Sequence, residues 1–423
     1  MTPQVAVVGG GWAGCAAALT LAEAGIPVTL FEASRTLGGR ARAVELENMT
    51  LDNGQHILLG AYEQTLRLIQ RLHPTPERAG LWRLPLALDQ PPDFRLACPR
   101  LPAPLHLLAG LLGARGLNWR EKLAAAHWAH TVLHDGHMPD RLTVGQFTRT
   151  QPEKLRRLLW HPLCVSALNT SPETASALVF RDVIRAAFGG RTHHSDLLLP
   201  RRDLTALFPT PAAARLCELD SEVRLSSRVT SLDAAGDAVT LETHTGKARY
   251  SHVILAVAPQ HLASLAAAVP ELASTLRDVA TYGYQPIATG YVQYDPAFQL
   301  GKPLLAMADG PVQFVFDRGP SHGQSGLLAY VASTATGLPA DWLDRAEDQL
   351  RRIVHPGLSL WRKSIVEKQA TFACVPDMVR PAVRTAHPRI FLAGDYTAGR
   401  FPATLESATG SGVQSAGALL EQL

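Results

Sequence analysis

The chain has 423 residues, enough for two domains or for two interleaved ones. A hydrophobic fraction of 46% and a charged fraction of 18% indicate a globular protein with a large apolar interior or an apolar contact surface. The net charge of +3 comes with no long basic run, so no nucleic-acid partner is indicated. The five cysteines are scattered and none forms C-x-x-C, so neither a disulfide framework nor a zinc site is indicated.

Residues 5–32, VAVVGGGWAGCAAALTLAEAGIPVTLFE, predict a buried strand, a glycine-rich turn, a helix and a second strand. Gly9, Gly11 and Gly14 fit G-x-G-x-x-G, which allows a tight turn, close approach of a pyrophosphate, and close packing of the helix on the sheet. The helix N-terminus offers free N–H groups to phosphates. Glu32 closes the second strand, where a carboxylate can bind both hydroxyls of an adenosine ribose. The pattern predicts dinucleotide binding and leaves NAD and FAD both open.

A second glycine–arginine loop follows in residues 33–42, ASRTLGGRAR. Arg40 and Arg42 beside Gly38 and Gly39 can place a guanidinium on the pyrophosphate. By itself, however, the segment fits a surface turn with two solvated arginines better.

Residues 51–60, LDNGQHILLG, form a turn before the helical pattern of residues 62–72. His56 follows this turn. A histidine there is more often structural, and it becomes a functional candidate only if the turn lies beside a cofactor ring.

The middle of the chain is rich in leucine and proline. We expect residues 74–104 to be irregular and residues 105–133 to be largely helical. Residues 142–168 are expected to contain at least one further helix. Pro172 and Glu173 are expected to begin another helix.

Residues 101–113, LPAPLHLLAGLLG, are the nearest approach to a membrane segment. They are too short to span a bilayer. They can lie in a membrane interface or form a buried helix or channel wall, and the sequence leaves both open. The N-terminus lacks the basic region of a signal peptide. The scattered cysteines fit a reducing compartment best, so a cytoplasmic location is expected.

His193, His194 and Asp196 lie close together in the sequence. Adjacent histidines point in different directions on any regular element, and no further ligands converge. No metal site is therefore expected.

Residues 223–250 predict a β-meander that leads into an apolar strand at 252–259, a common insertion in flavin-type dinucleotide folds. Later strands are expected at 287–294, 312–316, 326–333 and 364–372, with an amphipathic helix at 341–354. These elements indicate a second, mixed unit of sheet and helix.

Residues 389–395, RIFLAGD, predict a strand that ends at Gly394 and Asp395, followed by a helix from about Ala403. Asp395 can accept a hydrogen bond from a ribityl hydroxyl or reach the pyrophosphate through water. The N–H groups near Ala403 and Thr404 can favour negative charge at the pyrimidine end of a reduced flavin. Together with the N-terminal motif, this corner favours FAD over NAD.

Motifs spread over the whole chain resemble the FAD-dependent amine oxidase and phytoene desaturase superfamily. They are GGGWAG at 9–14, GGRAR at 38–42, DNGQH at 52–56, HVILAVAP at 252–259 and LAGD…PATLESA at 392–408. More specific stretches resemble the squalene-associated FAD-dependent desaturases, the hydroxysqualene dehydroxylase family. They are DNGQHILLGAYEQTLRLI at 52–69, LWHPLCVSALNTSPETASALVF at 159–180 and SDLLLPRRDLTALFPTPA at 195–212.

The resemblance implies an α/β fold, in which a Rossmann-like FAD-binding domain of the glutathione-reductase type is interleaved with an α+β substrate domain. The FAD-binding domain would comprise residues 1–60, 195–260 and 385–423. The substrate domain would comprise residues 61–194 and 261–384.

The resemblance also implies which positions bind the cofactor. These are Gly9, Gly11, Trp12, Ala13, Gly14, Glu32, Ala33, Gly39, Arg40, Asn53, Gly54, Gln55, His56, Val229, Gly394, Asp395, Ala403 and Thr404. Val229 would contact adenine through its backbone. FAD is expected to be non-covalent, because no motif places Cys374 at the flavin ring.

The reaction implied is reductive removal of the hydroxyl from hydroxysqualene, giving squalene and water, with electrons from an external donor. It needs a proton donor, a hydride from the flavin and an apolar tunnel for a long isoprenoid. His56 is the first candidate for the proton donor and Tyr62 the second, although a structural role is the commoner one for each. Because the substrate dissolves in bilayers, we expect peripheral association with the inner face of the cytoplasmic membrane.

Two alternatives remain open at this point. A desaturase that oxidises a carotenoid-type isoprenoid would use the same scaffold in the opposite direction. A non-catalytic FAD-bound protein could instead carry lipid between enzymes.

Overall fold

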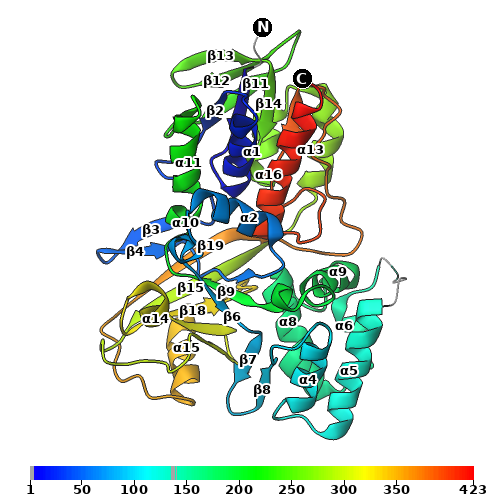
Figure 1. The fold of residues 1–423 in the computed structure, drawn as a ribbon, viewed down its shortest axis with the longest axis vertical. Coiled ribbons are helices and arrows are strands. Elements are labelled where there is room, and N and C mark those ends of the chain that lie inside the picture. The colour runs from blue at the N-terminus through cyan, green and yellow to red at the C-terminus, as the bar shows by residue number, and fades with distance from the viewer. Residues whose placement is uncertain (1–3, 135–138, 140) are drawn as a thin grey trace.

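A five-stranded parallel sheet carries the N-terminal glycine motif in the computed structural model, which describes residues 4–134, 139 and 141–423 (Figure 1). Its strands lie in the order β10 (Glu222–Arg224), β2 (Val28–Phe31), β1 (Val5–Val8), β14 (His252–Leu255) and β20 (Ile390–Leu392). All neighbouring pairs are parallel. The central strands are continuous buried runs, as expected for a sheet covered on both faces.

Helices from the two ends of the chain pack together on this sheet. Figure 1 shows α1 (Trp12–Glu23) beside α16 (Leu405–Leu420), with α11 (Pro209–Glu218) next to α1. Small residues allow the close contact, since a Cβ on Gly412 would lie 2.2 Å from the carbonyl oxygen of Ala13. The first and last segments of the chain therefore build one half of the fold together.

The expected meander is shorter than predicted. Its three strands are β11 (Val229–Asp233), β12 (Val239–Thr243) and β13 (Gly246–Tyr250). Residues 222–224 instead form β10 and pair with β2. The division occurs because the chain turns at Ser226, which has a φ of 53°. The N–H groups of Ser226 and Ser227 bond to the carbonyl oxygens of Ser34 and Glu32.

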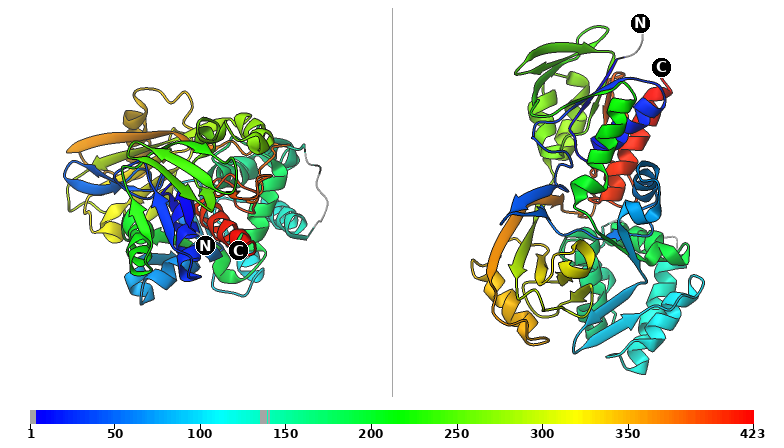
Figure 2. Two further views of the ribbon diagram at one scale, coloured as in Figure 1. Left: turned by 90° about the horizontal axis from the view of Figure 1, so that it is seen from above. Right: turned by 60° about the vertical axis from the view of Figure 1, so that its left-hand side comes forward.

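A second, antiparallel sheet forms one side of the lower half of the molecule (Figure 2, right). Its order is β16 (Leu304–Ala306), β17 (Phe314–Asp317), β18 (Leu327–Ala332), β15 (Tyr284–Gln293) and β19 (Trp361–Phe372). The helix α15 (Trp342–Arg351) packs on it where Gly290 leaves room for Trp342 and Leu343. These strands and this helix confirm the mixed unit expected from the sequence.

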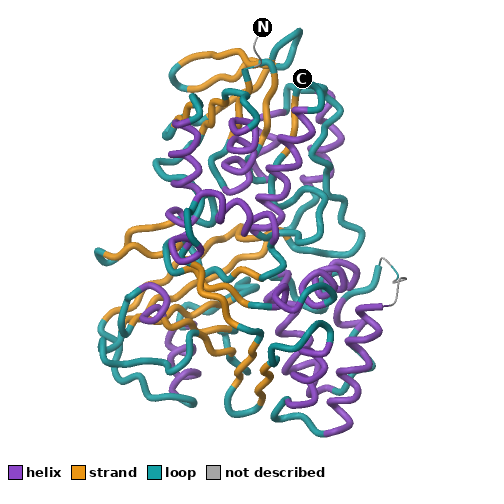
Figure 3. Tube along the Cα trace, viewed as in Figure 1, coloured by secondary structure: helices purple, strands orange, loops and turns teal. Residues whose placement is uncertain are grey.

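A mostly helical region lies beside the second sheet (Figure 3). It contains α4 (Leu105–Gly113), α5 (Trp119–His134), α6 (Val144–Phe147), α7 (Glu153–Leu155), the π-helical turn η1 (Arg156–Trp160), α8 (His161–Leu168) and α9 (Ala177–Phe188). Trp128 and Trp160 stack at its centre, with ring centroids 4.1 Å apart. Among the helices that the structure describes, none is long and apolar enough to cross a bilayer.

Two expectations for the middle of the chain are wrong. Residues 74–104 are not irregular, because they form α3 (Pro76–Ala79), β6 (Leu81–Leu84), β7 (Ala87–Gln90) and β8 (Phe94–Ala97). The strand β6 pairs with the distant β9 (Leu197–Pro200), a partner that a local pattern does not reveal. The helix expected from Pro172 begins only at Ala177, where the Ser176 side chain caps it.

The remaining elements connect these parts. They are β3 (Ala43–Leu46), β4 (Met49–Asp52), β5 (Leu58–Leu59), α2 (Glu63–Leu72), η2 (Thr192–Ser195), α10 (Leu204–Leu207), α12 (Pro259–Ala266), η3 (Pro270–Leu272), α13 (Ala273–Ala280) and α14 (Arg318–His322).

Candidate active site

A cavity of about 1160 Å³ is shared by the parallel sheet, the antiparallel sheet and the helical region. All the residues expected from the sequence to bind FAD line it, apart from Gly14. Tyr62 and His56, the two candidate proton donors, line it as well. The structure thus brings together segments from the start, the middle and the end of the chain.

The glycines at the carboxyl end of β1 have distinct roles. Gly9 has a φ of +111°, and a Cβ there would lie 2.5 Å from the carbonyl oxygen of Ala256. A Cβ on Gly14 would lie 1.8 Å from the carbonyl oxygen of Gly9, so this glycine lets α1 pack on the turn. A Cβ on Gly11, in contrast, would have one close neighbour, the Cα of Gly39 at 3.9 Å. The open space in front of Gly11 fits a pyrophosphate at the N-terminus of α1.

Glu32 lies at the end of β2 and lines the cavity. Its Oε2 accepts a hydrogen bond of 2.7 Å from the Gly10 N–H, and its Oε1 accepts one of 2.7 Å from the Ser34 N–H. These two bonds fix the carboxylate beside the cavity and leave further lone pairs for ribose hydroxyls. Val229 also lines the cavity, and the nearby Ser227 N–H bonds to the Glu32 carbonyl oxygen. The contact of Val229 with adenine stays a prediction.

The variant Glu32→Gln is expected to weaken FAD binding about 10- to 100-fold, because a charge-assisted hydrogen bond to ribose is lost. Titration of apoprotein with FAD, followed by quenching of flavin fluorescence, measures this. Glu218→Gln, at an exposed position on α11, should bind FAD like the wild type. Equal affinities for the Glu32 and Glu218 variants would contradict the ribose assignment.

Arg40 and Asp395 join the two ends of the chain inside the cavity. Arg40 Nη2 lies 2.6 Å from Asp395 Oδ1, and Arg40 Nη1 donates to the carbonyl oxygen of Ala370 at 2.8 Å. Asp395 is buried, and its backbone carbonyl accepts from the Ala403 N–H at 3.1 Å. The guanidinium expected on the pyrophosphate is therefore held by the carboxylate expected near the ribityl chain.

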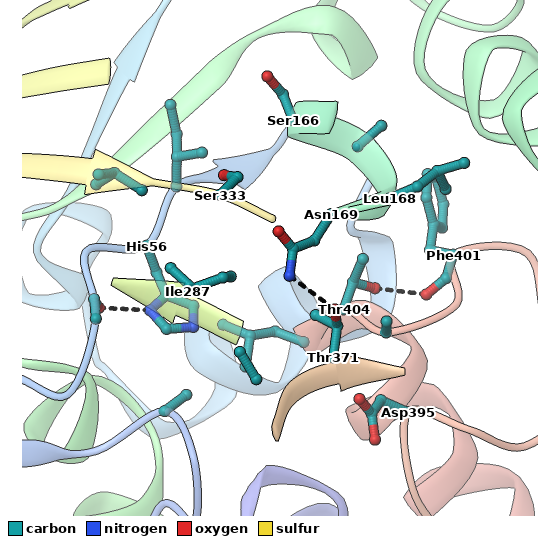
Figure 4. A pocket seen from close by; sticks show the side chains of 18 of the residues that line it. His56, Ser166, Leu168, Asn169, Ile287, Ser333, Thr371, Asp395, Phe401 and Thr404 are labelled. Atoms are coloured by element: carbon teal, nitrogen blue, oxygen red, sulfur yellow. Dashed lines mark hydrogen bonds between the residues drawn. The ribbon is translucent and has the colours of Figure 1, made fainter. Parts of the chain in front are cut away.

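The N-terminus of α16 faces the cavity at Ala403 and Thr404. Thr404 caps the helix by accepting from the Ser407 N–H at 3.2 Å, and its hydroxyl donates to the Phe401 carbonyl at 2.7 Å (Figure 4). Ala403 has a φ of 59°, which turns the chain into the helix. The positive end of this 16-residue helix fits the negative charge of a reduced flavin.

No motif in the sequence indicated the role of Glu406, in the first turn of α16. Its carboxylate accepts from the N–H groups of Gln64 and Thr65, both at 2.9 Å, and so caps α2 from another part of the chain. Burial raises the pKa of Glu406. The sequence offers only an indirect sign of this cap. Tyr62, the N-cap residue of α2, makes no side-chain cap bond, so the first N–H groups of α2 need another acceptor.

His56 lies next to the Gly54 turn, with Nδ1 2.7 Å from the Gly54 carbonyl oxygen (Figure 4). A carbonyl oxygen only accepts, so Nδ1 carries the proton in this arrangement and Nε2 presents a lone pair. Burial lowers the pKa of His56, which favours the neutral ring. A neutral ring in this tautomer accepts a hydrogen bond from the cavity through Nε2.

Tyr62 is buried, and its ring packs against that of Phe401 with centroids 5.3 Å apart. Burial raises the pKa of Tyr62 far above its ordinary value. Its phenol therefore keeps its proton at every working pH and can donate a hydrogen bond.

Two polar residues of the cavity wall, Glu367 and Asn169, were not among the predicted site positions. Glu367, on β19, accepts from Asn53 Nδ2 at 3.1 Å. Asn169 ends α8 in a left-handed conformation with a φ of 44°. Its Nδ2 donates to Thr371 Oγ1 at 2.9 Å (Figure 4), and its Oδ1 accepts from the Thr334 N–H at 2.7 Å. Asn169 thereby ties the helical region to the antiparallel sheet.

Most of the remaining cavity wall is apolar, although polar side chains such as Gln90, Arg157 and Gln313 also line it. Its lining includes Leu88 and Leu96 of the β7–β8 hairpin, Leu107 and Leu111 of α4, Trp128 of α5, and Val183, Ile184 and Phe188 of α9. Within the described residues, no cysteine lines the cavity. Cys374 is buried elsewhere, and burial raises the pKa of its thiol to about 12. The wall therefore offers an apolar chamber and no thiol for a covalent flavin bond.

The adjacent histidines have other partners. Asp196 pairs with Arg83 at 3.1 Å, and His194 Nε2 lies 3.3 Å from Glu63 Oε1. Over the described part of the chain, no group of three His, Cys, Asp or Glu side chains is placed to hold a metal ion.

A family model described as "Flavin containing amine oxidoreductase" matches residues 12–420. The chain belongs to this family. The curated hydroxysqualene dehydroxylase of Sinorhizobium fredii is 27% identical over 447 residues, covering 100% of this chain and 99% of that protein. The hydroxysqualene dehydroxylase of Rhodopseudomonas palustris is 27% identical over 456 residues, covering 99% of each chain. The solved structure of cyclohexylamine oxidase from Brevibacterium oxydans matches with a TM-score of 0.72 and 18% identity. The match covers 100% of this chain and 99% of that chain, and at this identity it shows the fold alone.

This flavoenzyme is an FAD-dependent oxidoreductase with an α/β, Rossmann-type fold, as the sequence predicted. The residues present fit FAD, because the open space at Gly11, the carboxylate of Glu32 and the N-terminus of α16 all border one cavity. Bound FAD supplies two-electron chemistry at its N5 atom. Glu32 would bind the adenosine ribose, Gly11 the pyrophosphate, and Thr404 with Ala403 the pyrimidine end.

Proposed function

We propose that this flavoenzyme removes the hydroxyl group of hydroxysqualene to give squalene and water. The observation that carries the proposal is the apolar chamber that adjoins the flavin-binding residues within one cavity of about 1160 Å³. Such a chamber suits a long isoprenoid and excludes water. The names of the two curated relatives, each matched over nearly its whole length, favour hydroxysqualene among isoprenoid alcohols.

The proposed reaction breaks one C–O bond and forms one C–H bond. The hydroxyl would leave as water after it gains a proton, and bound reduced FAD would supply the hydride that takes its place on carbon. Two electrons are consumed in each turnover. Because the sequence contains one dinucleotide fingerprint, we propose that an external donor reduces the flavin.

We propose that Tyr62 donates the hydrogen bond that helps the hydroxyl to leave. Its buried phenol keeps its proton, whereas His56 in its neutral form presents the lone pair of Nε2. His56 is then suited to orient the substrate or cofactor through an accepted hydrogen bond.

The variant Tyr62→Phe is expected to lower the rate of dehydroxylation about 100-fold while FAD content stays unchanged, because general-acid assistance contributes at least that much. Single-turnover rates of the purified holoenzyme measure the effect. His56→Gln, which keeps a polar side chain, is the comparison variant and should lose less. A larger loss in the His56 variant than in the Tyr62 variant would transfer the donor role to His56.

Anaerobic incubation with chemically reduced enzyme separates this function from the alternatives. Hydroxysqualene should be converted to squalene, as identified by mass spectrometry. Oxidation of a carotenoid precursor by the oxidised enzyme, with no squalene formed, would favour the desaturase. If neither substrate changes the redox state of the flavin, the protein is a lipid carrier.

We further propose that the enzyme works at the inner face of the cytoplasmic membrane, since its substrate dissolves in lipid. The exposed leucines of α4 support this location.

A further inference from the structure

The helix α4 has apolar side chains on two opposite faces. Leu107 and Leu111 line the cavity. Leu105, Leu108 and Leu112 point outward, with 53, 44 and 36% of their surface exposed. The outward face of a helix on a protein surface is ordinarily polar. A single helix therefore separates an apolar chamber from an apolar patch on the outside.

Further apolar side chains extend the exposed patch. Leu101, before α4, is 41% exposed, and Trp119 and Leu123 at the start of α5 are 63 and 49% exposed. The start of α5 adjoins the end of α4, because Lys122 Nζ donates to the carbonyl oxygen of Leu112 at 2.7 Å. We name these six exposed residues together the α4 face. It consists of Leu101, Leu105, Leu108, Leu112, Trp119 and Leu123.

Basic side chains accompany the α4 face. Arg100, Arg115 and Arg120 are exposed, and none of the ion pairs formed among the described residues involves them. Within residues 98–134, all of which the structure describes, Glu121 is the only acidic residue. Its Oε2 accepts a hydrogen bond of 2.7 Å from the Asn118 N–H. Leucine, tryptophan and unpaired arginine side chains together suit the interface of a bilayer that contains anionic lipid.

The position of α4 in the molecule fits this partner. Figure 1 places α4 and the start of α5 at the end of the molecule opposite the two termini. The inner side of α4 is fixed, since a Cβ on Gly110 would lie 2.6 Å from Cys98 Sγ and Thr192 Oγ1 donates to the Leu101 carbonyl at 2.8 Å. On the outer side, Leu105 and Leu108 keep 53 and 44% of their surface exposed in the described structure.

We propose that the α4 face lies in the interfacial layer of an anionic bilayer, and that the isoprenoid substrate enters the cavity from that bilayer beside α4. The entry of substrate rests on the proposed function, whereas the membrane contact does not. The inner leucines of α4, Leu107 and Leu111, line the chamber, so an isoprenoid that entered beside α4 would meet apolar side chains on this helix.

Flotation of the full-length holoenzyme with vesicles tests the membrane contact. The wild type should bind vesicles of phosphatidylcholine with phosphatidylglycerol more tightly than vesicles of phosphatidylcholine alone, and less tightly at high salt. The double variant Leu105→Glu/Leu108→Glu should bind at least about tenfold more weakly. The matched control Leu358→Glu/Leu360→Glu changes two leucines that are 86 and 66% exposed elsewhere and should bind like the wild type.

Two results would overturn the proposal. One is a wild type that does not float with anionic vesicles. The other is unchanged flotation of the Leu105→Glu/Leu108→Glu variant. If light scattering then shows a dimeric wild type and a monomeric variant, the α4 face contacts a second copy of the chain instead.

Substrate delivery tests the entry route. Turnover of hydroxysqualene dispersed in detergent should be the same for the wild type and the Leu105→Glu/Leu108→Glu variant, because neither leucine lines the cavity. Turnover of hydroxysqualene embedded in vesicles should fall about tenfold or more in the variant alone. Equal turnover from vesicles would overturn the entry route. A wild type inactive in detergent would instead contradict the proposed function, and flotation would still decide the membrane contact.

Discussion

The variant Gly14→Ala is expected to lose FAD completely and to unfold more readily than the wild type. The added Cβ would lie 1.8 Å from the carbonyl oxygen of Gly9 and 3.0 Å from the carbonyl carbon. Both of these are backbone atoms, so either α1 or the turn at the end of β1 must move. Overpacking of this kind costs about 3 kcal/mol or more, and here it also moves the N–H groups expected to bind the pyrophosphate.

The control is Gly410→Ala, in the middle of α16. No atom lies within 4 Å of its Cβ position, and alanine stabilises a helix by about 1 kcal/mol relative to glycine. Flavin absorbance per protein and the thermal midpoint of the apoprotein measure the two effects separately. Retention of FAD by the Gly14 variant would contradict the described packing of α1 on the glycine turn.

The variant Arg318→Met is expected to lower the free energy of unfolding by about 3–5 kcal/mol at pH 8, as removal of one partner from a buried ion pair does. Arg318 is fully buried. Its Nη1 lies 3.5 Å from Asp52 Oδ2 and donates to Gln55 Oε1 at 2.7 Å. Methionine would leave the Asp52 carboxylate and the Gln55 amide oxygen without this partner. Gln55 directly precedes His56 in the chain.

The loss in the Arg318 variant should depend on pH. Burial raises the pKa of Asp52 to about 6, even though Arg318 acts to lower it. Because this folded-state pKa lies above the unfolded value, the stability linked to Asp52 is fully present below about pH 4 and is lost as pH rises through about 6. Without Arg318 the pKa of Asp52 rises further, so the difference between variant and wild type should grow from pH 6 to pH 8.

The control for this prediction is Arg345→Met. Arg345 pairs with Asp341 at 2.9 Å on the exposed side of α15, and such a pair contributes about 0.5 kcal/mol or less. Denaturant unfolding at several pH values measures both variants. Equal and pH-independent losses at positions 318 and 345 would contradict the buried network around Asp52.

The parts of the fold that sequence could predict are those fixed by nearby residues. Residues 5–32 predict β1, α1 and β2 because a buried run, a glycine turn and a helix follow one another without interruption. The same applies to α16, which begins beside Thr404 as expected. Local physical rules are sufficient to predict the type of each element, although its packing partners are distant in the chain. The helix α1 packs mainly on α16, and β1 pairs with β14 as well as with β2.

Pairings between distant segments could not be predicted in this way. The strand β6 depends on β9, and residues 222–224 join the parallel sheet through β2. Their short sequences are compatible with loops or with other strand pairings. Whether they form strands depends on the distant strand with which each one pairs. The same limit applies to the cap that Glu406 gives to α2, because the two lie far apart in the sequence.

The positions that line the site could be predicted from the sequence, whereas the hydrogen bonds and ion pairs between them could not. The predicted positions lie around one cavity, with Gly14 behind it, and whether they bind FAD stays a prediction. No motif indicated that Arg40 would pair with Asp395, that Glu367 would accept from Asn53, or that Asn169 would tie two regions together. Each of these contacts forms only when the chain brings its beginning, middle and end together.

The most direct test is a single anaerobic turnover of the reduced holoenzyme with hydroxysqualene. Flavin oxidation is followed by absorbance, and squalene is measured in samples quenched at the same times. The proposed function predicts that squalene appears at the rate at which the flavin is oxidised, with one squalene formed for each flavin. A flavin that stays reduced in the presence of substrate, or becomes oxidised without formation of squalene, would contradict it.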